Sequence, residues 1–249
     1  MLDQLCDLVQ NCSQAVVLTG AGISAESGVP TFRGKEGLWG KFRAEELATM
    51  EAFLRNPEIV WEWYSWRRKL ISEVQPNPGH FALAELADYF DSFTLVTQNV
   101  DGLHRVAGST DILELHGNIN RNKCVKCEAP FDEVDIDPAR IPKCKGCGGS
   151  IRPDVVWFGE MLPGEVIEAA FRRSEEADLF FSIGTSAIVH PAASLPMTAR
   201  RCGATLVEIN PEETPLSNLA DIRIGAPSGE FLPKLLDAVK ARKNQSGQG

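Results

Sequence analysis

The sequence predicts an α/β fold in which a Rossmann-like, doubly wound parallel sheet carries a smaller lobe made of a helical insertion and a zinc ribbon. Three observations predict this architecture. Apolar strand-like runs alternate with helical patterns, a glycine-rich loop follows the first of these runs, and two C-x-x-C pairs interrupt the alternation. The chain has 249 residues, of which 43% are hydrophobic, so it can bury a substantial core.

Strands are expected where nearly every residue of a short run is apolar, because both faces of a parallel sheet are covered. Such runs occupy residues 15–19, 93–97, 112–115, 179–183, 204–209 and 221–224. Helical periodicity covers residues 2–12, 57–73, 79–89, 164–176, 190–201 and 230–242. Strands that alternate with helices indicate a doubly wound, mostly parallel sheet.

Two stretches break the alternation. Residues 35–77 are rich in tryptophan and helical in period, with no strand expected, and residues 119–151 contain both C-x-x-C pairs. We interpret both as insertions that form a small lobe over the carboxyl edge of the sheet. The Rossmann-like lobe then comprises residues 1–34, 78–118 and 152–249.

The formal net charge of −9 argues against a general nucleic-acid-binding protein, which needs a basic face. It suits a basic partner such as a lysine-rich peptide, although an acidic surface that keeps a protein dispersed accounts for the same charge. No apolar run resembles a signal peptide or a membrane span. Seven cysteines, four of them in C-x-x-C pairs, fit a reducing compartment, so a cytoplasmic protein with no membrane partner is expected.

A glycine loop at residues 20–24 follows the first apolar run. In a parallel sheet this turn is where the pyrophosphate of a dinucleotide meets backbone N–H groups and a helix N-terminus. Gly20 and Gly22 leave room for phosphate, and Ser24 can cap the helix that follows. The next strand comes only after about seventy residues, which disfavours a hydride-transfer enzyme with its acidic residue about twenty residues on.

Two cysteine pairs, Cys124-x-x-Cys127 and Cys144-x-x-Cys147, are separated by sixteen residues. Four thiolates close a tetrahedral Zn²⁺ site without an open position, so the ion is expected to fold the small lobe rather than to catalyse. The alternatives are two redox dithiols, or a ribbon whose lysines contact nucleic acid. The other three cysteines, expected to be core thiols in apolar helical contexts, are Cys6, Cys12 and Cys202.

Four segments line up in order: GAGISAESGVPTFR (20–33), TQNVDGLHRVAG (97–108), ELHGN (114–118) and the cysteine pairs. Together they resemble the sirtuin family, and GTS (184–186) and VEIN (207–210) extend the resemblance to about residues 10–235. The resemblance implies an NAD-dependent protein-lysine deacylase that holds NAD⁺ and an acyl-lysine peptide between its two lobes. The products are free lysine, nicotinamide and O-acyl-ADP-ribose.

The resemblance makes His116 the general base at a ribose hydroxyl. His116 ends a strand, which places it at the carboxyl edge where ligands bind, and an imidazole titrates near neutrality. A buried structural histidine is the alternative reading, and His80 and His104, which begin helices, are expected to cap or to pack. The NAD⁺ contacts implied by the resemblance are Gly20, Ala21, Gly22, Ser24, Ala25, Thr31, Phe32, Arg33, Gln98, Asn99, Val100, Asp101, Gly184, Thr185, Ser186, Asn210, Glu212 and Ser228.

The acyl-peptide site is expected on two segments. The run Val156, Trp157, Phe158, Gly159 would pair with the substrate backbone, unless it is an ordinary buried strand. Tyr64 and Arg67 lie three apart on a predicted helix, hence on one face, and resemble the Tyr-x-x-Arg pair of the class III, desuccinylase-like sirtuins. Ala48 matches a small residue that widens their acyl pocket. The alternative is a helix whose Arg67 and Arg68 are simply solvated.

A carboxylate at the end of a succinyl, malonyl or glutaryl group would find a bidentate partner in Arg67 and a further donor in Tyr64. The sequence therefore predicts a deacylase that prefers acidic acyl-lysines and retains some deacetylation. Three alternatives remain open: an acetyl-preferring deacetylase, a mono-ADP-ribosyltransferase, and a non-enzymatic NAD- or zinc-binding module. His116, Asn99 and Asp101 together argue against the last of these, because a sensor needs no base.

Overall fold

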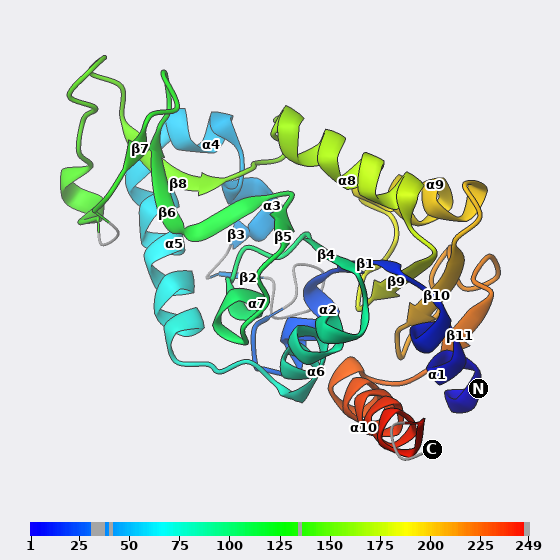
Figure 1. Cartoon of the computed structure of the whole chain (residues 1–249). Coiled ribbons are helices and arrows are strands. Elements are labelled where there is room, and N and C mark those ends of the chain that lie inside the picture. Colours follow the sequence, from blue (N-terminus) through cyan, green and yellow to red (C-terminus); the bar gives the residue numbers. More distant parts are fainter. Residues whose placement is uncertain (31–37, 40–41, 134–135, 247–249) are drawn as a thin grey trace.

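A six-stranded parallel sheet organises the larger lobe (Figure 1). The structure is a computed structural model that describes residues 1–30, 38–39, 42–133 and 136–246. Strand order is β11-β10-β9-β1-β4-β5, and the order reverses at β1, which creates a topological switch point between β1 and β9. This confirms the predicted doubly wound fold. The strands are β1 (Gln14–Thr19), β4 (Ser92–Thr97), β5 (Ile112–Glu114), β9 (Leu179–Ile183), β10 (Thr205–Ile209) and β11 (Ile222–Ile224).

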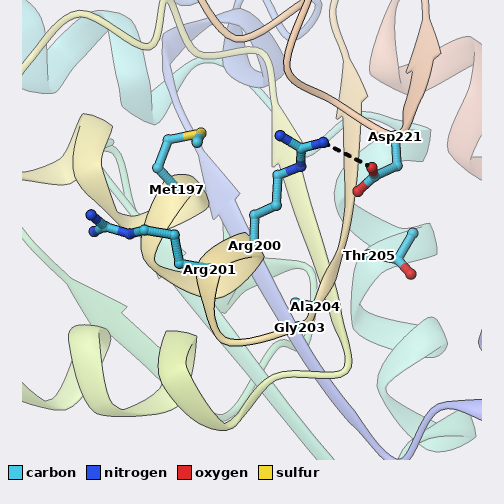
Figure 2. A pocket seen from close by; sticks show the side chains of 7 residues that line it. All are labelled: Met197, Arg200, Arg201, Gly203, Ala204, Thr205 and Asp221. Carbon is cyan, nitrogen blue, oxygen red and sulfur yellow. Dashed lines mark hydrogen bonds and ion pairs between the residues drawn. The ribbon is translucent and has the colours of Figure 1, made fainter.

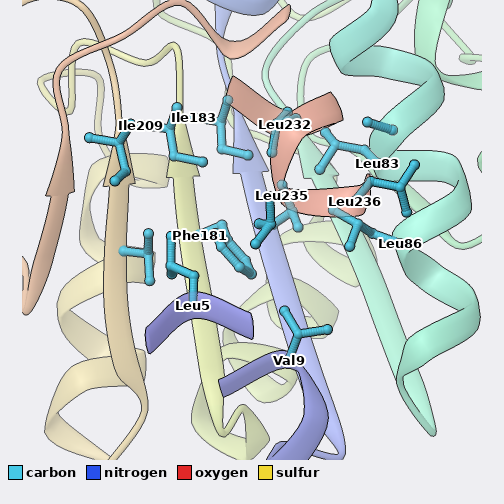
Figure 3. Close-up of a cluster of buried hydrophobic side chains, with 14 of the residues drawn as sticks. Leu5, Val9, Leu83, Leu86, Phe181, Ile183, Ile209, Leu232, Leu235 and Leu236 are labelled. Carbon is cyan, nitrogen blue, oxygen red and sulfur yellow. The ribbon is translucent and has the colours of Figure 1, made fainter. Parts of the chain in front are cut away.

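One face of the sheet is covered by α1 (Leu2–Asn11), α6 (Pro78–Leu86) with its 3-10 extension η2 (Ala87–Tyr89), and α10 (Ser228–Ser246). Apolar residues three or four apart along these helices place their side chains on the face that meets the strands. Figure 3 shows this core, in which Leu5, Val9, Leu83, Leu86, Leu232, Leu235 and Leu236 lie against Phe181, Ile183 and Ile209. Burial of each such side chain stabilises the sheet by about 1.5–3 kcal/mol.

The opposite face is covered by α8 (Gly164–Glu176) and α9 (Leu195–Arg201), which follows the 3-10 turn η4 (Ala192–Ser194). Their Ala170, Leu195 and Ala199 are fully buried against the outer residues of β1 and β9. Cys202 ends α9 but is exposed, so its prediction as a core thiol is wrong, whereas Cys6 is buried on α1.

The smaller lobe combines an antiparallel sheet with helices. Its strands β6 (Gly117–Cys124), β7 (Pro130–Phe131) and β8 (Ile151–Val155) lie in the order β7-β6-β8. The helices are α3 (Ala44–Leu47), α4 (Met50–Arg55), α5 (Pro57–Ser72) and the 3-10 turn η3 (Pro138–Arg140). Residues 35–77 were expected to contain no strand, but β2 (Leu38–Trp39) and β3 (Phe42–Arg43) pair antiparallel. Two-residue strands are too short to produce a period in the sequence.

Helix α5 carries the centre of the small-lobe core. It begins at Pro57 because Asn56 accepts a hydrogen bond from the Ile59 amide at 3.2 Å and proline at the first helical position has no amide hydrogen to satisfy. Its Trp61, Trp63 and Tyr64 are buried with residues of β6 and β8. We propose the division into two lobes given above, with the zinc-ribbon insertion extended to residues 117–155, because β6 and β8 belong to the sheet of the smaller lobe. In the part of the chain that the structure describes, no helix is long and apolar enough to cross a membrane.

Candidate active site

Five strands of the large sheet end at one edge, and the predicted site residues follow them there. The loop after β1 contains Gly20 and the short helix α2 (Ala21–Ala25), and residues 98–101 follow β4. His116 lies two residues beyond β5, residues 184–186 follow β9, and Asn210 follows β10. In parallel sheets the carboxyl edge at the switch point is where ligands bind. Predicted contacts Thr31, Phe32 and Arg33 lie outside the described residues.

The loops after β1 and β9 pack backbone to backbone. A Cβ atom on Gly20 would lie 2.8 Å from Thr185 Cα, and one on Gly22 would lie 2.7 Å from the Cα of Gly184. The Gly22 amide donates to the Gly184 oxygen at 2.8 Å, and Gly184 has a φ of +57°. Glycine is therefore required here by the neighbouring loop, a reason additional to the expected approach of a phosphate.

Ser24 does not cap α2, because Gly20 is the N-cap and Ser24 lies inside the helix, which corrects the expectation. Its buried hydroxyl instead accepts a hydrogen bond from the side-chain amide nitrogen of Asn99 at 3.0 Å, and the same nitrogen donates to the backbone oxygen of Gly20 at 3.0 Å. His80 Nε2 lies 3.5 Å from the Ser24 hydroxyl. These contacts join the β1 loop to the segment after β4.

Thr185 connects three of the predicted residues. Gln98 donates to the Thr185 hydroxyl at 2.9 Å, and Asn210 donates to the Thr185 carbonyl oxygen at 2.9 Å. Glu212 is exposed beyond Asn210. The hydroxyl of Ser228, at the start of α10, donates to Glu26 at 2.7 Å, so that Ser228 is held against the end of α2. Of the remaining predicted residues, Ala21 and Ser186 are partly buried, Ala25 is exposed, and Val100 is buried.

His116 has a fixed ring orientation. Its Nδ1 lies 2.8 Å from the carbonyl oxygen of Gln98. A carbonyl only accepts, so Nδ1 carries the hydrogen and Nε2 is left as a proton acceptor. Burial lowers the pKa of His116 below its ordinary value, and the hydrogen bond to Gln98 opposes that shift. The ring is therefore neutral at pH 7, as a general base requires.

Asp101 is a buried carboxylate beside this edge. It accepts a hydrogen bond from the Leu103 amide at 2.9 Å, at the start of the short helix α7 (Leu103–Val106). Burial raises the pKa of Asp101, and hydrogen bonds from Leu103 and Ser24 and the charge of Arg67 oppose the rise. The Asn-Val-Asp-Gly segment forms a turn in which Gly102 has a φ of +78° and Asp101 is buried.

A buried polar layer beneath the edge was not predicted. The Thr19 hydroxyl donates to the Thr97 hydroxyl at 2.9 Å, which also accepts from the backbone amide of Asn99 at 3.1 Å. His104 Nε2 lies 3.0 Å from the Thr19 hydroxyl. Burial lowers the pKa of His80 to about 4 and that of His104 to about 3. His80 closes a capping box with Asn77, which confirms its expected capping role. A threonine at the end of each of two strands does not indicate, in a single sequence, that the two side chains form a hydrogen bond.

The segment predicted to bind the peptide backbone lies between β8 and the helical insertion. The backbone amide hydrogens of residues 156–158 already have acceptors within the protein. The Val156 amide donates to the His116 oxygen at 2.9 Å, and the Phe158 amide donates to the Ala48 oxygen at 2.9 Å. The Trp157 amide donates to the Glu160 carboxylate at 2.8 Å. Carbonyl oxygens and Gly159 are therefore what this segment can offer a peptide. The ring of Phe158 is exposed, whereas Trp157 is buried.

Tyr64 and Arg67 share a face of α5, as expected. The indole nitrogen of Trp157 donates to the Tyr64 hydroxyl at 2.8 Å, and the Arg67 guanidinium lies over the Trp63 ring at 5.3 Å. Burial lowers the pKa of Arg67, and the neighbouring Tyr64 and Asp101 oppose the shift. The alternative of two solvated arginines is wrong, because Arg68 is buried and donates to the Ile119 oxygen and to Asn122, each at 2.6 Å.

The four predicted cysteines converge at the base of β6 and β8. Their sulfur atoms all lie within 4.8 Å of one another, and three of the pairs are 3.4 to 3.7 Å apart. Thiolates around a tetrahedral zinc ion, with Zn–S distances of about 2.3 Å, stand roughly 3.8 Å apart. The donor set therefore fits a structural zinc ion.

A surface hollow of about 490 Å³ elsewhere on the large lobe is lined by Arg200, Arg201 and Asp221 among others (Figure 2). Gly203, Ala204 and Thr205 lie where the chain enters β10, and Asp221 precedes β11. The hollow is therefore at the amino edge of the sheet, opposite the residues described above. Because of this position the hollow is not part of the candidate active site, and its Arg200 is paired with Asp221 at 3.3 Å.

Comparison with known proteins agrees with this geometry. A family model described as the Sir2 family matches residues 20–191. An NAD-dependent protein deacylase of Aquifex aeolicus is 51% identical over 233 residues, which are 93% of this chain and 98% of the relative. A solved Sir2 homolog–NAD complex has a TM-score of 0.91 at 45% identity, covering 96% and 94% of the two chains. A Sir2–p53 peptide–NAD⁺ complex has a TM-score of 0.86 at 33% identity, covering 96% and 98%.

Proposed function

The chain belongs to the Sir2 family of NAD-dependent protein deacylases, and from this premise we propose that it removes acidic acyl groups from lysine in preference to acetyl. The proposed substrate is a protein or peptide that carries succinyl- or malonyl-lysine. The observation that carries this proposal is Arg67, a cation placed beside the buried Tyr64 on α5 and close enough to Asp101 for their charges to interact.

In this reaction NAD⁺ supplies the ribose carbon that is attacked and nicotinamide as the leaving group. We assign the pyrophosphate to the paired loops after β1 and β9, where the amide hydrogens of Ala21 and Ser186 have no partner among the described residues. Asn99 and Asp101 are assigned to the ribose and the nicotinamide amide. The acyl oxygen of the substrate would displace nicotinamide at that ribose carbon. His116 Nε2 would then remove the proton of a ribose hydroxyl that attacks the acyl carbon, and addition of water would release free lysine and O-acyl-ADP-ribose.

The residues around the acyl end support an acidic group. Trp157 and Phe158 connect two parts of the pocket, because Trp157 donates to Tyr64 and Phe158 donates to the backbone of Ala48. Burial raises the pKa of Tyr64 to about 12, so the phenol stays a neutral donor at working pH. The Arg67 guanidinium supplies the positive charge, and the Ala48 side chain leaves space for a longer acyl chain.

The energetic argument is one of compensation. A carboxylate removed from water without a partner loses several kcal/mol, whereas a charged hydrogen bond contributes about 1.5–3 kcal/mol net. One such bond corresponds to a roughly ten- to hundredfold preference for succinyl over a neutral acyl group. Acetyl-lysine still fits the same site, so slower deacetylation is expected.

The test compares nicotinamide release from one peptide that carries succinyl-lysine or acetyl-lysine. Replacing Arg67 (Arg67→Met) should lower the succinyl-to-acetyl ratio of kcat/KM by about ten- to hundredfold, the loss of one charged hydrogen bond. Lys69→Met is the matched control, because Lys69 is an exposed cation on the same helix and should leave the ratio unchanged.

Equal losses for the two peptides in the Arg67 variant would overturn the acyl preference. A wild-type enzyme that is faster on acetyl-lysine would identify an acetyl-preferring deacetylase. Intact-protein mass spectrometry of the products separates the remaining class, because transfer of ADP-ribose adds mass to a target whereas deacylation removes it.

A further inference from the structure

Trp157 is a buried residue whose polar edge points at the acyl-selecting tyrosine. It is 1% exposed, and its indole nitrogen is 2.8 Å from the Tyr64 oxygen. An indole N–H can only donate, so Tyr64 is the acceptor in this hydrogen bond. The hydrogen of the Tyr64 hydroxyl must therefore point elsewhere, and among the described residues it has no acceptor.

The orientation of the Trp157 ring is set by two contacts with the ring and one at its backbone. The guanidinium of Arg152 stacks on the ring at 3.4 Å from the centroid, and Phe53 packs against it with centroids 5.3 Å apart. The Trp157 amide donates to Glu160 at 2.8 Å. Arg152 and Glu160 form a double ion pair, and Arg152 also donates to the Val155 oxygen at 2.6 Å. The direction of the indole N–H is thus fixed by its neighbours.

A phenol without such a partner can point its hydrogen to either side of the C–O bond, in the plane of the ring. Because the indole N–H occupies one lone pair of the Tyr64 oxygen, the hydroxyl hydrogen is restricted to the remaining directions. Arg67 lies one helical turn further along α5, so a carboxylate at the acyl end would meet a cation and an oriented donor together. A donor fixed in advance loses less entropy when the ligand binds.

We propose that Trp157 is a positioning residue for acyl specificity: its indole N–H orients the Tyr64 hydroxyl toward the terminal carboxylate of an acidic acyl-lysine. This inference rests on the proposed acyl preference and adds a residue to it. Trp157 acts through Tyr64, and its neighbour Phe158 lies in the segment assigned to the peptide. The residue therefore couples the peptide segment to the helix that selects the acyl group.

The experiment removes the N–H and keeps the ring. Trp157→Phe is the genetic variant, and incorporation of benzothienylalanine at position 157, in which sulfur replaces the N–H, preserves the shape of the side chain if phenylalanine prevents folding. Kinetics are measured with succinyl- and acetyl-lysine versions of one peptide. Loss of one neutral hydrogen bond should lower the succinyl-to-acetyl ratio of kcat/KM roughly fivefold. The change should appear in KM, because the carboxylate is held equally before and during the chemical step.

Two comparisons distinguish positioning from packing. In a Tyr64→Phe background the replacement of Trp157 should leave the ratio unchanged, because the hydroxyl through which it acts is gone. Phe53→Leu removes one ring contact of Trp157 but keeps its N–H and the Arg152 and Glu160 contacts that hold it, so it should alter both substrates alike. A ratio that survives the benzothienylalanine replacement overturns the inference, as does a fall in the ratio that persists without the Tyr64 hydroxyl. A wild-type enzyme with no preference for succinyl-lysine would instead refute the proposed function itself.

Discussion

Replacement of Gly22 by alanine tests whether the two loops at the switch point form the dinucleotide site. The new methyl carbon would lie 2.7 Å from the Cα and oxygen atoms of Gly184, about 0.7 Å closer than the 3.4 Å at which ordinary contact begins. Both neighbours are backbone atoms held by hydrogen bonds, because the Gly22 amide donates to the Gly184 oxygen at 2.8 Å and the Gly184 amide donates to the Ile209 oxygen at 3.0 Å. One loop must therefore move.

The expected magnitude follows from that displacement. Overpacking of this kind reduces the free energy of unfolding by about 1–3 kcal/mol, which lowers Tm by several degrees for a chain of this length. A shift of about 0.7 Å also weakens at least one hydrogen bond from the loops to the pyrophosphate. Such a charged bond contributes about 1.5–3 kcal/mol, so the Kd for NAD⁺ should rise roughly ten- to hundredfold.

Calorimetric titration with NAD⁺ and a thermal melt measure the two effects on the same preparation. Gly164→Ala is the matched control, because a Cβ atom at Gly164, the first residue of α8, has no heavy atom within 4 Å. The Gly22 variant must bind NAD⁺ more weakly than this control at a temperature where both are folded. Affinity within twofold of the wild type would refute the assignment of the pyrophosphate to these loops.

Two further predictions concern His116 and the cysteine cluster. Burial lowers the pKa of His116, and the proposed base acts in its neutral form. We therefore expect kcat/KM to stay level through neutral pH and to fall tenfold per pH unit only below 6.5, the ordinary pKa of a histidine. An inflection above pH 6.5 in a pH–rate profile would contradict this expectation. Removal of zinc by a chelator should release one ion per chain, abolish activity and lower Tm by more than about 10 °C. The reason is that binding of a structural zinc ion contributes directly to folding. An unchanged thermal melt of the metal-free chain would count against a structural role.

Hydrophobic periodicity in the sequence was sufficient to predict the strands and covering helices of the large lobe. The helix expected at residues 164–176 is α8, and the strand expected at 179–183 is β9, with the same bounds. Burial on both faces of a parallel sheet leaves a continuous apolar run, and a helix that covers one face leaves a repeat of three or four residues. The cysteine pairs were equally informative, because few other arrangements place four thiolates at that spacing.

The site was predictable only where residues sit at strand ends in recognisable motifs. Ser24 was expected to cap a helix, but the helix begins earlier, at Ala21 with Gly20 as its N-cap, and the serine hydroxyl contacts Asn99 instead. A solvated Arg68 was left open as the alternative, but Arg68 is buried and backbone carbonyls of β6 accept its hydrogens. Each outcome depends on a partner more than fifty residues away, and a single sequence contains no record of such pairings.

The three histidines near this edge differ in how far their surroundings allow them to accept a proton, which supports the proposed role of His116 as the base. His80 and His104 lie beneath the loops with ring centroids 4.8 Å apart, and burial lowers their pKa values to about 4 and 3. Rings with such pKa values bind protons too weakly to act as bases at neutral pH, so they serve as neutral hydrogen-bonding groups beneath Ser24 and Thr19. His116 lies beyond the end of β5, where the Gln98 carbonyl both fixes its tautomer and opposes the effect of burial. The same fold thus keeps two imidazoles as structural groups and leaves the third able to accept a proton.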